Sequence, residues 1–253
     1  TEDQYCREAS HEHMAKTSPL LTQPDVVLEV SHGWPKTDKH YLRSTISPAA
    51  NIARRSLSVD GSSHFFAYMA RMKFIQRWGV MRNTQSENIQ EHSLQAAMLA
   101  HALALIARDQ FGRDVDPERV MALAVFHDAS EVITGDLPSP IKHHDPELSS
   151  AYGRIEAAAR ERLSTMLPEC LRGSYRPLLS GEDRPEHLQL VKAADKLCSY
   201  LKCLEELKSG NTEFVHARAA IEREIQSLDQ PEVDWFMDHF VPSFSLTLDE
   251  LNQ

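Results

Sequence analysis

The sequence predicts an all-α fold, and two observations carry this prediction. From residue 62 onward, apolar residues recur at spacings of three and four, which is the period of helices that bury one face. The same stretch shows no convincing alternation of apolar and polar residues, no internal repeat and no Gly-rich phosphate-binding loop. With 253 residues the chain can bury a substantial core. We therefore expect a helical bundle as the main domain.

Composition separates residues 1–60 from the rest of the chain. This stretch is rich in Ser and Thr, has only short apolar clusters, and contains four scattered prolines, Pro19, Pro24, Pro35 and Pro48. We interpret it as a weakly ordered or irregular N-terminal extension, with the helical domain over residues 61–253. His11 and His13 within it are interpreted as solvated side chains. Nearby acidic residues such as Glu2 and Asp3 argue against a transit peptide.

The first two helices of the domain are predicted from apolar stripes. Residues 64–78 place Phe65, Met69 and Met72 on one face, with Ser62 or Ser63 available as the N-cap. Residues 91–109 repeat this spacing. Their predicted apolar face consists of Leu94, Ala97, Met98, His101, Leu105 and Ile106. We interpret His101 as a core histidine and Met98 as a packing residue.

The remaining helices are placed by start and stop signals. Asp116 as N-cap and Pro117 at the first position begin a third helix, which runs through His127 and Glu131 to a turn over residues 134–140. Further helices are expected over residues 146–166, 186–208 and 213–228, and a short one over residues 233–240.

Four potential metal ligands occur in the order His92, His127, Asp128 and Asp195, on three different predicted helices. An adjacent His and Asp at the polar end of an apolar helix cost desolvation energy unless both side chains are paired. A divalent cation pairs them well, because imidazole nitrogen and carboxylate oxygen are both suitable ligands. Two imidazoles and two carboxylates also leave coordination positions open, as in catalytic metal sites.

Taken singly, these residues have simpler interpretations. Asp195, between Lys192 and Lys196, resembles one partner of a surface ion pair, and His92 resembles a hydrogen-bonded residue at a helix start. The complete set in this order favours a metal site.

Two further carboxylates are candidates for proton transfer. Glu131 follows His127 by four residues and Asp128 by three, which on a helix places it beside the pair. Asp136 follows in the turn after Gly135. Without a functional role, Glu131 would be interpreted as a solvated carboxylate at a helix end. Asp136 would be interpreted as a turn residue, where Asp is favoured for local backbone reasons.

Charge and cysteine content exclude some classes of function. The formal net charge is -10, so a nucleic acid polymer is an unfavourable partner, although a local cationic pocket still allows a small anionic substrate. The four cysteines show no CxxC spacing and are interpreted as free thiols in a reducing compartment, which indicates a cytoplasmic protein. No apolar run approaches the length of a membrane span.

The chain resembles the HD-domain phosphohydrolases and, more narrowly, the 5'-deoxynucleotidases of the YfbR type. The resemblance covers nearly all of residues 62–251. Its matching stretches are residues 63–67 (SHFFA), 73–78 (KFIQRW), 81–83 (MRN), 87–95 (ENIQEHSLQ), 126–132 (FHDASEV), 134–138 (TGDLP), 192–195 (KAAD), 200–206 (YLKCLEE) and 241–244 (VPSF).

The resemblance implies a role for each candidate residue. It implies that His92, His127, Asp128 and Asp195 hold a single divalent ion, with cobalt or manganese as the usual activator. None of the candidate site residues departs from the family pattern.

The resemblance also assigns the substrate and its contacts. Arg77 matches the residue that binds the substrate phosphate. Trp78 matches the next residue of the family, which lines the nucleoside pocket and helps to exclude ribose. Glu131 and Asp136 match carboxylates placed for proton transfer. The implied reaction is hydrolysis of deoxyribonucleoside 5'-monophosphates with little base preference, by a homodimer. Without the resemblance, Arg77 and Trp78 would be interpreted as a cation and an aromatic anchor at a helix end.

Two alternatives remain open at this point. The chain could be an HD phosphohydrolase acting on another nucleotide ester, although the lack of a broad basic surface counts against polyanionic substrates. It could also be a non-catalytic nucleotide-binding or scaffold module of the same fold. The complete set of candidate ligands argues against that second alternative.

Overall fold

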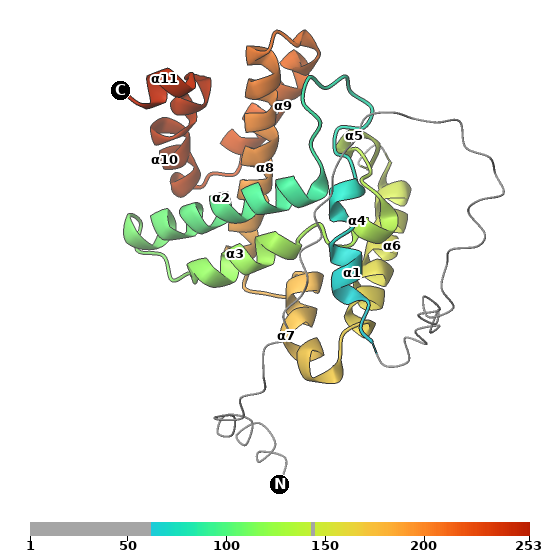
Figure 1. Ribbon diagram of the computed structural model, residues 1–253. Helices are drawn as coiled ribbons and strands as arrows, with labels where there is room; N and C mark the ends of the chain where they lie inside the picture. The colour runs from blue at the N-terminus through green and yellow to red at the C-terminus, as the bar shows by residue number, and fades with distance from the viewer. Residues whose placement is uncertain (1–61, 143–144) are drawn as a thin grey trace, which may run out of the picture. The chain divides into compact units, whose positions relative to one another are not determined.

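The computed structural model describes residues 62–142 and 145–253, and these residues form a helical domain (Figure 1). The predicted extension over residues 1–60, with His11 and His13, lies outside the described residues. In the described part, β-pairing is limited to one isolated antiparallel bridge between Gln76 and Asn88. The all-α prediction is therefore confirmed. None of the described helices combines the length and the apolar character needed to cross a membrane.

In chain order the elements are α1 (Phe65–Met69), η4 (Met72–Phe74), α2 (Ile89–Asp109), α3 (Pro117–Phe126), α4 (Glu131–Thr134), α5 (Ser139–Lys142), α6 (Pro146–Thr165), α7 (Glu169–Ser180), α8 (Pro185–Lys208), η5 (Thr212–Phe214), α9 (Val215–Gln226), α10 (Pro231–His239), η6 (Val241–Ser245) and α11 (Leu248–Leu251). The longest connection between described elements is the one from η4 to α2, residues 75–88.

Side-chain caps fix where three of the helices begin. Asn88 accepts hydrogen bonds from the backbone N–H groups of Gln90 and Glu91, at 3.0 and 3.1 Å, and so begins α2. Asp116 caps α3 and Asp145 caps α6, and each is followed by a proline in the first helical turn. The predicted starts of the third and fourth helices are thereby confirmed.

The main core lies between α2, α3, α8, α9 and α10, and α2 crosses α8 beside α3 (Figure 1). On α2 the buried face is rich in alanine, with Ala96, Ala100, Ala104 and Ala107 all at 0% exposure. Small side chains let the neighbouring helices approach closely. A second, smaller core joins α1, α6 and α7 around Phe65, Leu163 and Leu179.

The predicted apolar face of the second helix is wrong in part. Leu94 and Met98 are 62% and 58% exposed, and His101 is only half-buried, although Ala97 and Ile106 are buried as expected. The large apolar side chains suggested the wrong face, because the buried face of α2 is built largely from alanines that carry little hydrophobic signal each.

Two predicted helices are shorter than expected. The first ends at Met69 and continues only as the short 3-10 helix η4. The third ends at Phe126, after which the Ala129 N–H donates to the Phe126 carbonyl and the Glu131 N–H donates to the Asp128 carbonyl. Glu131 therefore begins the separate helix α4 instead of lying on the same helix as His127.

Helix α7 was not predicted. Its sequence contains Gly173 and Pro177, both of which disfavour a helix interior. Its packing against the second core through Leu179 outweighs these propensities. Gly181, with φ of 66°, adopts the left-handed conformation that ends the helix.

A buried carboxylate on α8 holds the segment between η4 and α2. Glu206 is 1% exposed and accepts hydrogen bonds from the Thr84 N–H at 2.9 Å, the Thr84 hydroxyl at 2.7 Å and the Gln85 N–H at 3.2 Å. It also pairs with the buried Lys202, whose ammonium donates to the Gln85 carbonyl. Asn211 adds a hydrogen bond at 2.8 Å.

We expect Glu206→Ala to lower the free energy of unfolding by about 3–5 kcal/mol, because it leaves the Lys202 ammonium buried without its partner. Burial opposes ionisation, but Lys202, Asn211 and Thr84 hold the pKa of Glu206 well below its usual 4.5. This stabilisation is therefore present above about pH 4.5 and is lost as the pH falls. Urea unfolding at pH 7 and pH 3 measures both effects. The exposed neighbour Glu205→Ala is the control, and equal losses for the two variants would contradict the assignment.

Candidate metal centre and its substrate-facing residues

Side chains from three helices converge on one point. His92 lies in α2 and is fully buried, His127 and Asp128 directly follow α3, and Asp195 lies in α8. The Nε2 atom of His92 is 3.3 Å from His127 Nε2, 3.4 Å from Asp128 Oδ2 and 3.2 Å from Asp195 Oδ1. His127 Nε2 is itself 3.2 Å from Asp128 Oδ2. The structure thus brings together the four residues that the sequence proposed as ligands.

These contacts fit a cation better than hydrogen bonds alone. One N–H proton on His92 Nε2 satisfies one acceptor, yet three potential ligand atoms surround that nitrogen. The ligand atoms of His92, His127 and Asp128 all lie within 4.8 Å of one another, so a single ion can reach each of them. Asp195 adds a carboxylate from the α8 side through its contact with His92.

The His127 ring is oriented by its other nitrogen. Its Nδ1 lies 2.7 Å from the Ala124 carbonyl, to which it donates, so that Nε2 faces the cluster. Burial lowers the pKa of His127, but the charges of Asp128 and Asp195 more than offset this and raise it to about 9. A cation at Nε2 must therefore displace a proton.

The two aspartates of the cluster are held ionised. Burial opposes ionisation of Asp128, but His127 and His92 keep its pKa well below the usual range. The pKa of Asp195 is also lowered, because its hydrogen bond with His92 and the nearby His127 outweigh burial. Two carboxylates that keep their charge are the donor chemistry that a divalent ion requires.

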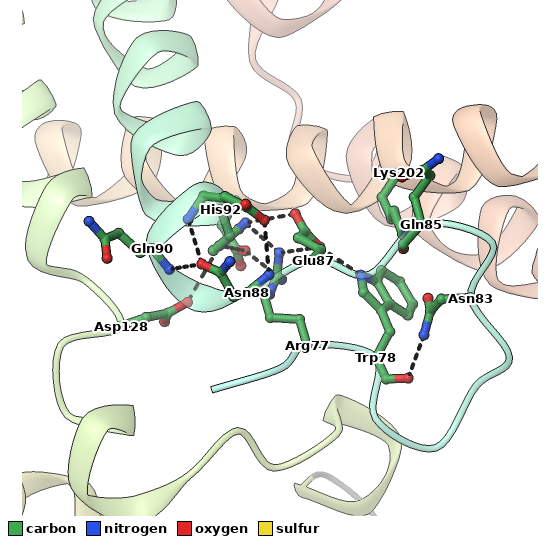
Figure 2. Close-up of polar contacts among 12 residues, drawn as sticks. Arg77, Trp78, Asn83, Gln85, Glu87, Asn88, Gln90, His92, Asp128 and Lys202 are labelled. Atoms are coloured by element: carbon green, nitrogen blue, oxygen red, sulfur yellow. Dashed lines mark hydrogen bonds and ion pairs between the residues drawn. The ribbon is translucent and has the colours of Figure 1, made fainter. Parts of the chain in front are cut away.

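Arg77 contacts two residues of this cluster. It reaches Asp195 Oδ1 at 3.7 Å and Glu87 Oε2 at 3.3 Å, and its Nη1 contacts His92 Nδ1 (Figure 2). Burial lowers the pKa of Arg77, but the charges of Glu87 and Asp195 more than offset this and raise it above its ordinary value, so the guanidinium stays charged. A fixed, largely buried guanidinium beside a metal-type cluster suits bidentate binding of a phosphate.

Trp78 has an unusual backbone conformation. Its φ of 59° places a bulky residue in the left-handed region, which costs about 1–3 kcal/mol. Three contacts hold it there: the indole N–H donates to Glu87 Oε2 at 3.1 Å, the Asn83 amide donates to the Trp78 carbonyl at 3.2 Å, and the ring packs 5.3 Å from that of Phe214. Such strain is typical of functional sites.

Glu87 was not singled out from the sequence. It accepts from both Arg77 and Trp78 on the same oxygen, and it lies at the start of α2, next to the Asn88 cap (Figure 2). Its only sequence signal is a position five residues before His92, which a solvated turn carboxylate would share. The contacts come from the fold of the segment between η4 and α2, which the sequence did not predict.

Glu131 is half-buried close to the charges of the cluster. Burial is the main cause that raises its pKa to about 9, and the negative charges of Asp128 and Asp136 raise it further. Its Oε2 atom is buried with no hydrogen-bond partner among the described residues. A carboxyl group that is protonated at neutral pH can donate a proton.

Asp136 lies in the turn after α4. Burial raises its pKa, and the field of Arg77 partly offsets that effect. The turn is fixed by the Tyr152 hydroxyl, which donates to the Gly135 carbonyl at 3.1 Å. Gly135 has a φ of 73°, which glycine adopts without strain. Asp136 thus shares the field of the site, with no direct contact to the four ligand candidates among the described hydrogen bonds and ion pairs.

Comparisons with known proteins find related sequences over most of the described domain. Residues 64–244 match the family described as 5'-deoxynucleotidase YfbR-like. The chain is 52% identical over 192 residues to a 5'-deoxynucleotidase of Erwinia tasmaniensis, which covers 76% of this chain and 97% of the relative. It is also 52% identical over 191 residues to a 5'-deoxynucleotidase of Vibrio cholerae, covering 75% and 98%.

Solved structures share the fold. An HD-domain phosphohydrolase from Listeria innocua (lin2634) superposes with a TM-score of 0.63 at 22% identity, over 75% of this chain and 92% of that one. The HD phosphohydrolase DatZ of cyanophage S-2L, solved with dA and one catalytic zinc ion, gives a TM-score of 0.53 at 23% identity, over 72% and 97%.

We expect His92→Ala and Asp195→Asn to lose the bound divalent ion, because each removes one of the converging ligand atoms. The measurement is metal content per chain after incubation with cobalt or manganese and gel filtration. His101→Ala, a half-buried histidine of the same helix α2, is the matched control and should retain one ion per chain. Equal metal content in wild type and both ligand variants, with unchanged circular dichroism, would refute the ligand set.

Proposed function

The chain belongs to the YfbR-like 5'-deoxynucleotidase family, and from this premise we propose that it hydrolyses deoxyribonucleoside 5'-monophosphates to deoxynucleosides and phosphate. The observation that carries the proposal is the convergence of His92, His127, Asp128 and Asp195 beside the buried guanidinium of Arg77. A dianionic phosphate monoester fits a site that combines a cation-binding cluster with a fixed arginine.

The cluster would hold one divalent ion through His92, His127, Asp128 and Asp195. We propose cobalt or manganese, since two imidazoles and two carboxylates accept either. Such an ion would neutralise charge on the phosphate and make water a stronger nucleophile near neutral pH. One zinc ion in the DatZ structure supports a divalent metal in this fold.

The residues of the chain bind and orient the substrate. Arg77, held from one side by Glu87, offers its remaining N–H groups to the phosphate oxygens. Trp78, adjacent in the chain, is placed to pack against the deoxynucleoside and to exclude a ribose hydroxyl. Its indole is fixed by Glu87 and Phe214. Fixed orientation lowers the entropic part of the barrier.

Breaking the ester bond requires a proton. As water oxygen bonds to phosphorus and the bond from phosphorus to the 5'-oxygen breaks, the leaving alkoxide must be protonated, since it is a poor leaving group. Glu131 is the proposed donor, because burial keeps it protonated at neutral pH. Asp136, whose pKa is also raised, is the second candidate and is placed to contact substrate.

We further propose a cytoplasmic homodimer. The reduced cysteines Cys198 and Cys203, both buried and free, suit a reducing compartment. For the dimer, Leu94 and Met98 on α2 expose apolar surface that a second copy would cover. Light scattering tests this, with a mass of twice 28.7 kDa expected for this chain. A monomer at micromolar concentration would contradict it.

Phosphate release from a panel of deoxyribo- and ribonucleoside 5'-monophosphates, with and without cobalt or manganese, tests the function. Metal-dependent release from the deoxy series, with little base preference, is the expected result. Release only from triphosphates or cyclic nucleotides would favour an HD phosphohydrolase of different substrate class. Binding without release under every metal would favour a non-catalytic nucleotide-binding module.

We expect Glu131→Gln to retain the divalent ion and to lower kcat by about 10²–10⁴, because an amide cannot donate the proton. In the wild type, the donor form exists below the Glu131 pKa of about 9, so kcat should fall as the pH rises through that region. A pH profile of kcat checks the second effect. A rate that stays level to pH 10, or a Glu131→Gln enzyme with wild-type kcat, would remove Glu131 from this role.

A further inference from the structure

Building on the proposed function, we propose that Glu87 is a positioning residue, which fixes the phosphate-binding Arg77 and the nucleoside-facing Trp78 in one arrangement beside His92. Glu87 touches neither the substrate nor the reacting atoms in this assignment. It acts through the two side chains that do.

One carboxylate oxygen makes both contacts. Oε2 of Glu87 accepts from Arg77 Nη1 at 3.3 Å and from Trp78 Nε1 at 3.1 Å (Figure 2). The other oxygen, Oε1, lies 3.9 Å from His92 Nδ1, on the side of that ring away from the ligand cluster. Glu87 and Arg77 are 12% and 13% exposed, so little water competes for these contacts.

The backbone holds Glu87 itself in place. The Arg77 N–H donates to the Glu87 carbonyl at 2.9 Å, and the Ile89 N–H donates to the Ile75 carbonyl at 2.9 Å. These bonds flank the bridge between Gln76 and Asn88 and close the base of the segment that carries Arg77 and Trp78. The carboxylate of Glu87 therefore extends from a fixed backbone towards the side chains of Arg77 and Trp78, which it contacts.

Trp78 depends on such an anchor because its own backbone is strained. At a φ of 59°, the backbone of Trp78 is higher in free energy than in the common negative-φ regions, so other contacts must keep it from relaxing. The indole bond to Glu87 is its one side-chain hydrogen bond among the described residues. Phe214 in η5 supports the ring, but packing alone does not fix the direction of the N–H.

Arg77 has a second acidic neighbour, and this makes Glu87 decisive for its direction. Nη2 lies 3.7 Å from Asp195 Oδ1, which belongs to the proposed ligand set. Nη1 contacts both Glu87 Oε2 and His92 Nδ1, and of these two only Glu87 carries the negative charge that balances Asp195, so the guanidinium is held between the two carboxylates. Without Glu87, the pull of Asp195 is unbalanced, and the guanidinium would turn towards the ligand cluster and away from its phosphate-binding orientation.

The test compares Glu87→Gln and Glu87→Ala with the control Glu91→Gln. Glu91 lies four residues further along, belongs to the α2 capping box and makes no contact with Arg77 or Trp78 among the described hydrogen bonds and ion pairs. Glutamine at 87 keeps an oxygen for the Trp78 N–H but loses the charge that balances Arg77. Alanine loses both functions.

We expect Glu87→Gln to lower kcat by about tenfold or more with a smaller change in KM, because Arg77 keeps its charge but loses its orientation in the transition state. Its preference for deoxy- over ribonucleotides, measured as the ratio of kcat/KM values, should stay near that of the wild type. Glu87→Ala should lower kcat and also reduce that preference several-fold. Glu91→Gln should match the wild type in all three quantities. A Glu87→Ala enzyme that was merely destabilised would lose active fraction equally on both substrates and would keep the wild-type preference, so the fall in preference separates the two explanations.

A second readout is independent of turnover. Acrylamide quenching of Trp78 fluorescence, isolated by subtracting the same variants in a Trp78→Phe background, should increase in Glu87→Ala and not in Glu91→Gln. If the wild type releases phosphate from deoxynucleotides but the Glu87 variants match Glu91→Gln in kcat, KM, preference and quenching, the positioning role is refuted alone. If the wild type releases no phosphate, the proposed function fails, and unchanged quenching in Glu87→Ala would then also refute the anchoring of Trp78.

Discussion

The site depends on mutual compensation of charges that the core would otherwise exclude. His92 is fully buried, yet it lies within 3.4 Å of another imidazole and two carboxylates. An isolated ionised carboxylate in such surroundings costs several kcal/mol. Here each charge is offset by neighbours, and the depressed pKa values of Asp128 and Asp195 record that balance. A divalent ion would complete the balance with two positive charges.

This requirement is met mostly by groups at helix ends and in connections, with Asp195 in the middle of α8 as the exception. His127 and Asp128 follow the last residue of α3, and Arg77 and Trp78 lie in the segment before α2. A side chain in mid-helix is tied to the direction that the helix imposes, whereas a turn can aim each residue separately. Helix α8 supplies rigidity: Asp195 reaches the cluster, and Glu206, three turns further on, holds Thr84 and Gln85 in the same connection.

The sequence predicted the parts of the structure that depend on strong local signals. Asp116 and Pro117 located the start of α3, because this capping signal lies in two adjacent residues. The residue types and order of His92, His127–Asp128 and Asp195 predicted one metal cluster, although these residues lie far apart in the sequence. The sequence predictions failed where long-range packing determines the structure. Leu94 and Met98 were predicted to lie on the buried face of α2, but they are exposed and alanines are buried instead. Helix α7 was not predicted, and it forms despite Pro177. Glu87 was missed because its contacts exist only after the chain turns back on itself between η4 and α2.

The strained Trp78 connects these observations. A left-handed backbone at a bulky residue is unfavourable in isolation, so surrounding contacts must fix it. Asn83, Phe214 and Glu87 hold Trp78 from three sides, while Glu206 and Lys202 hold the connection that follows it. Most of these partners are polar groups that are buried or nearly so, and each would be costly if it were left unpaired. One set of interactions therefore determines both the stability of the connection and the geometry of the site. The contacts that satisfy buried polar groups also set the direction of Arg77 and Trp78.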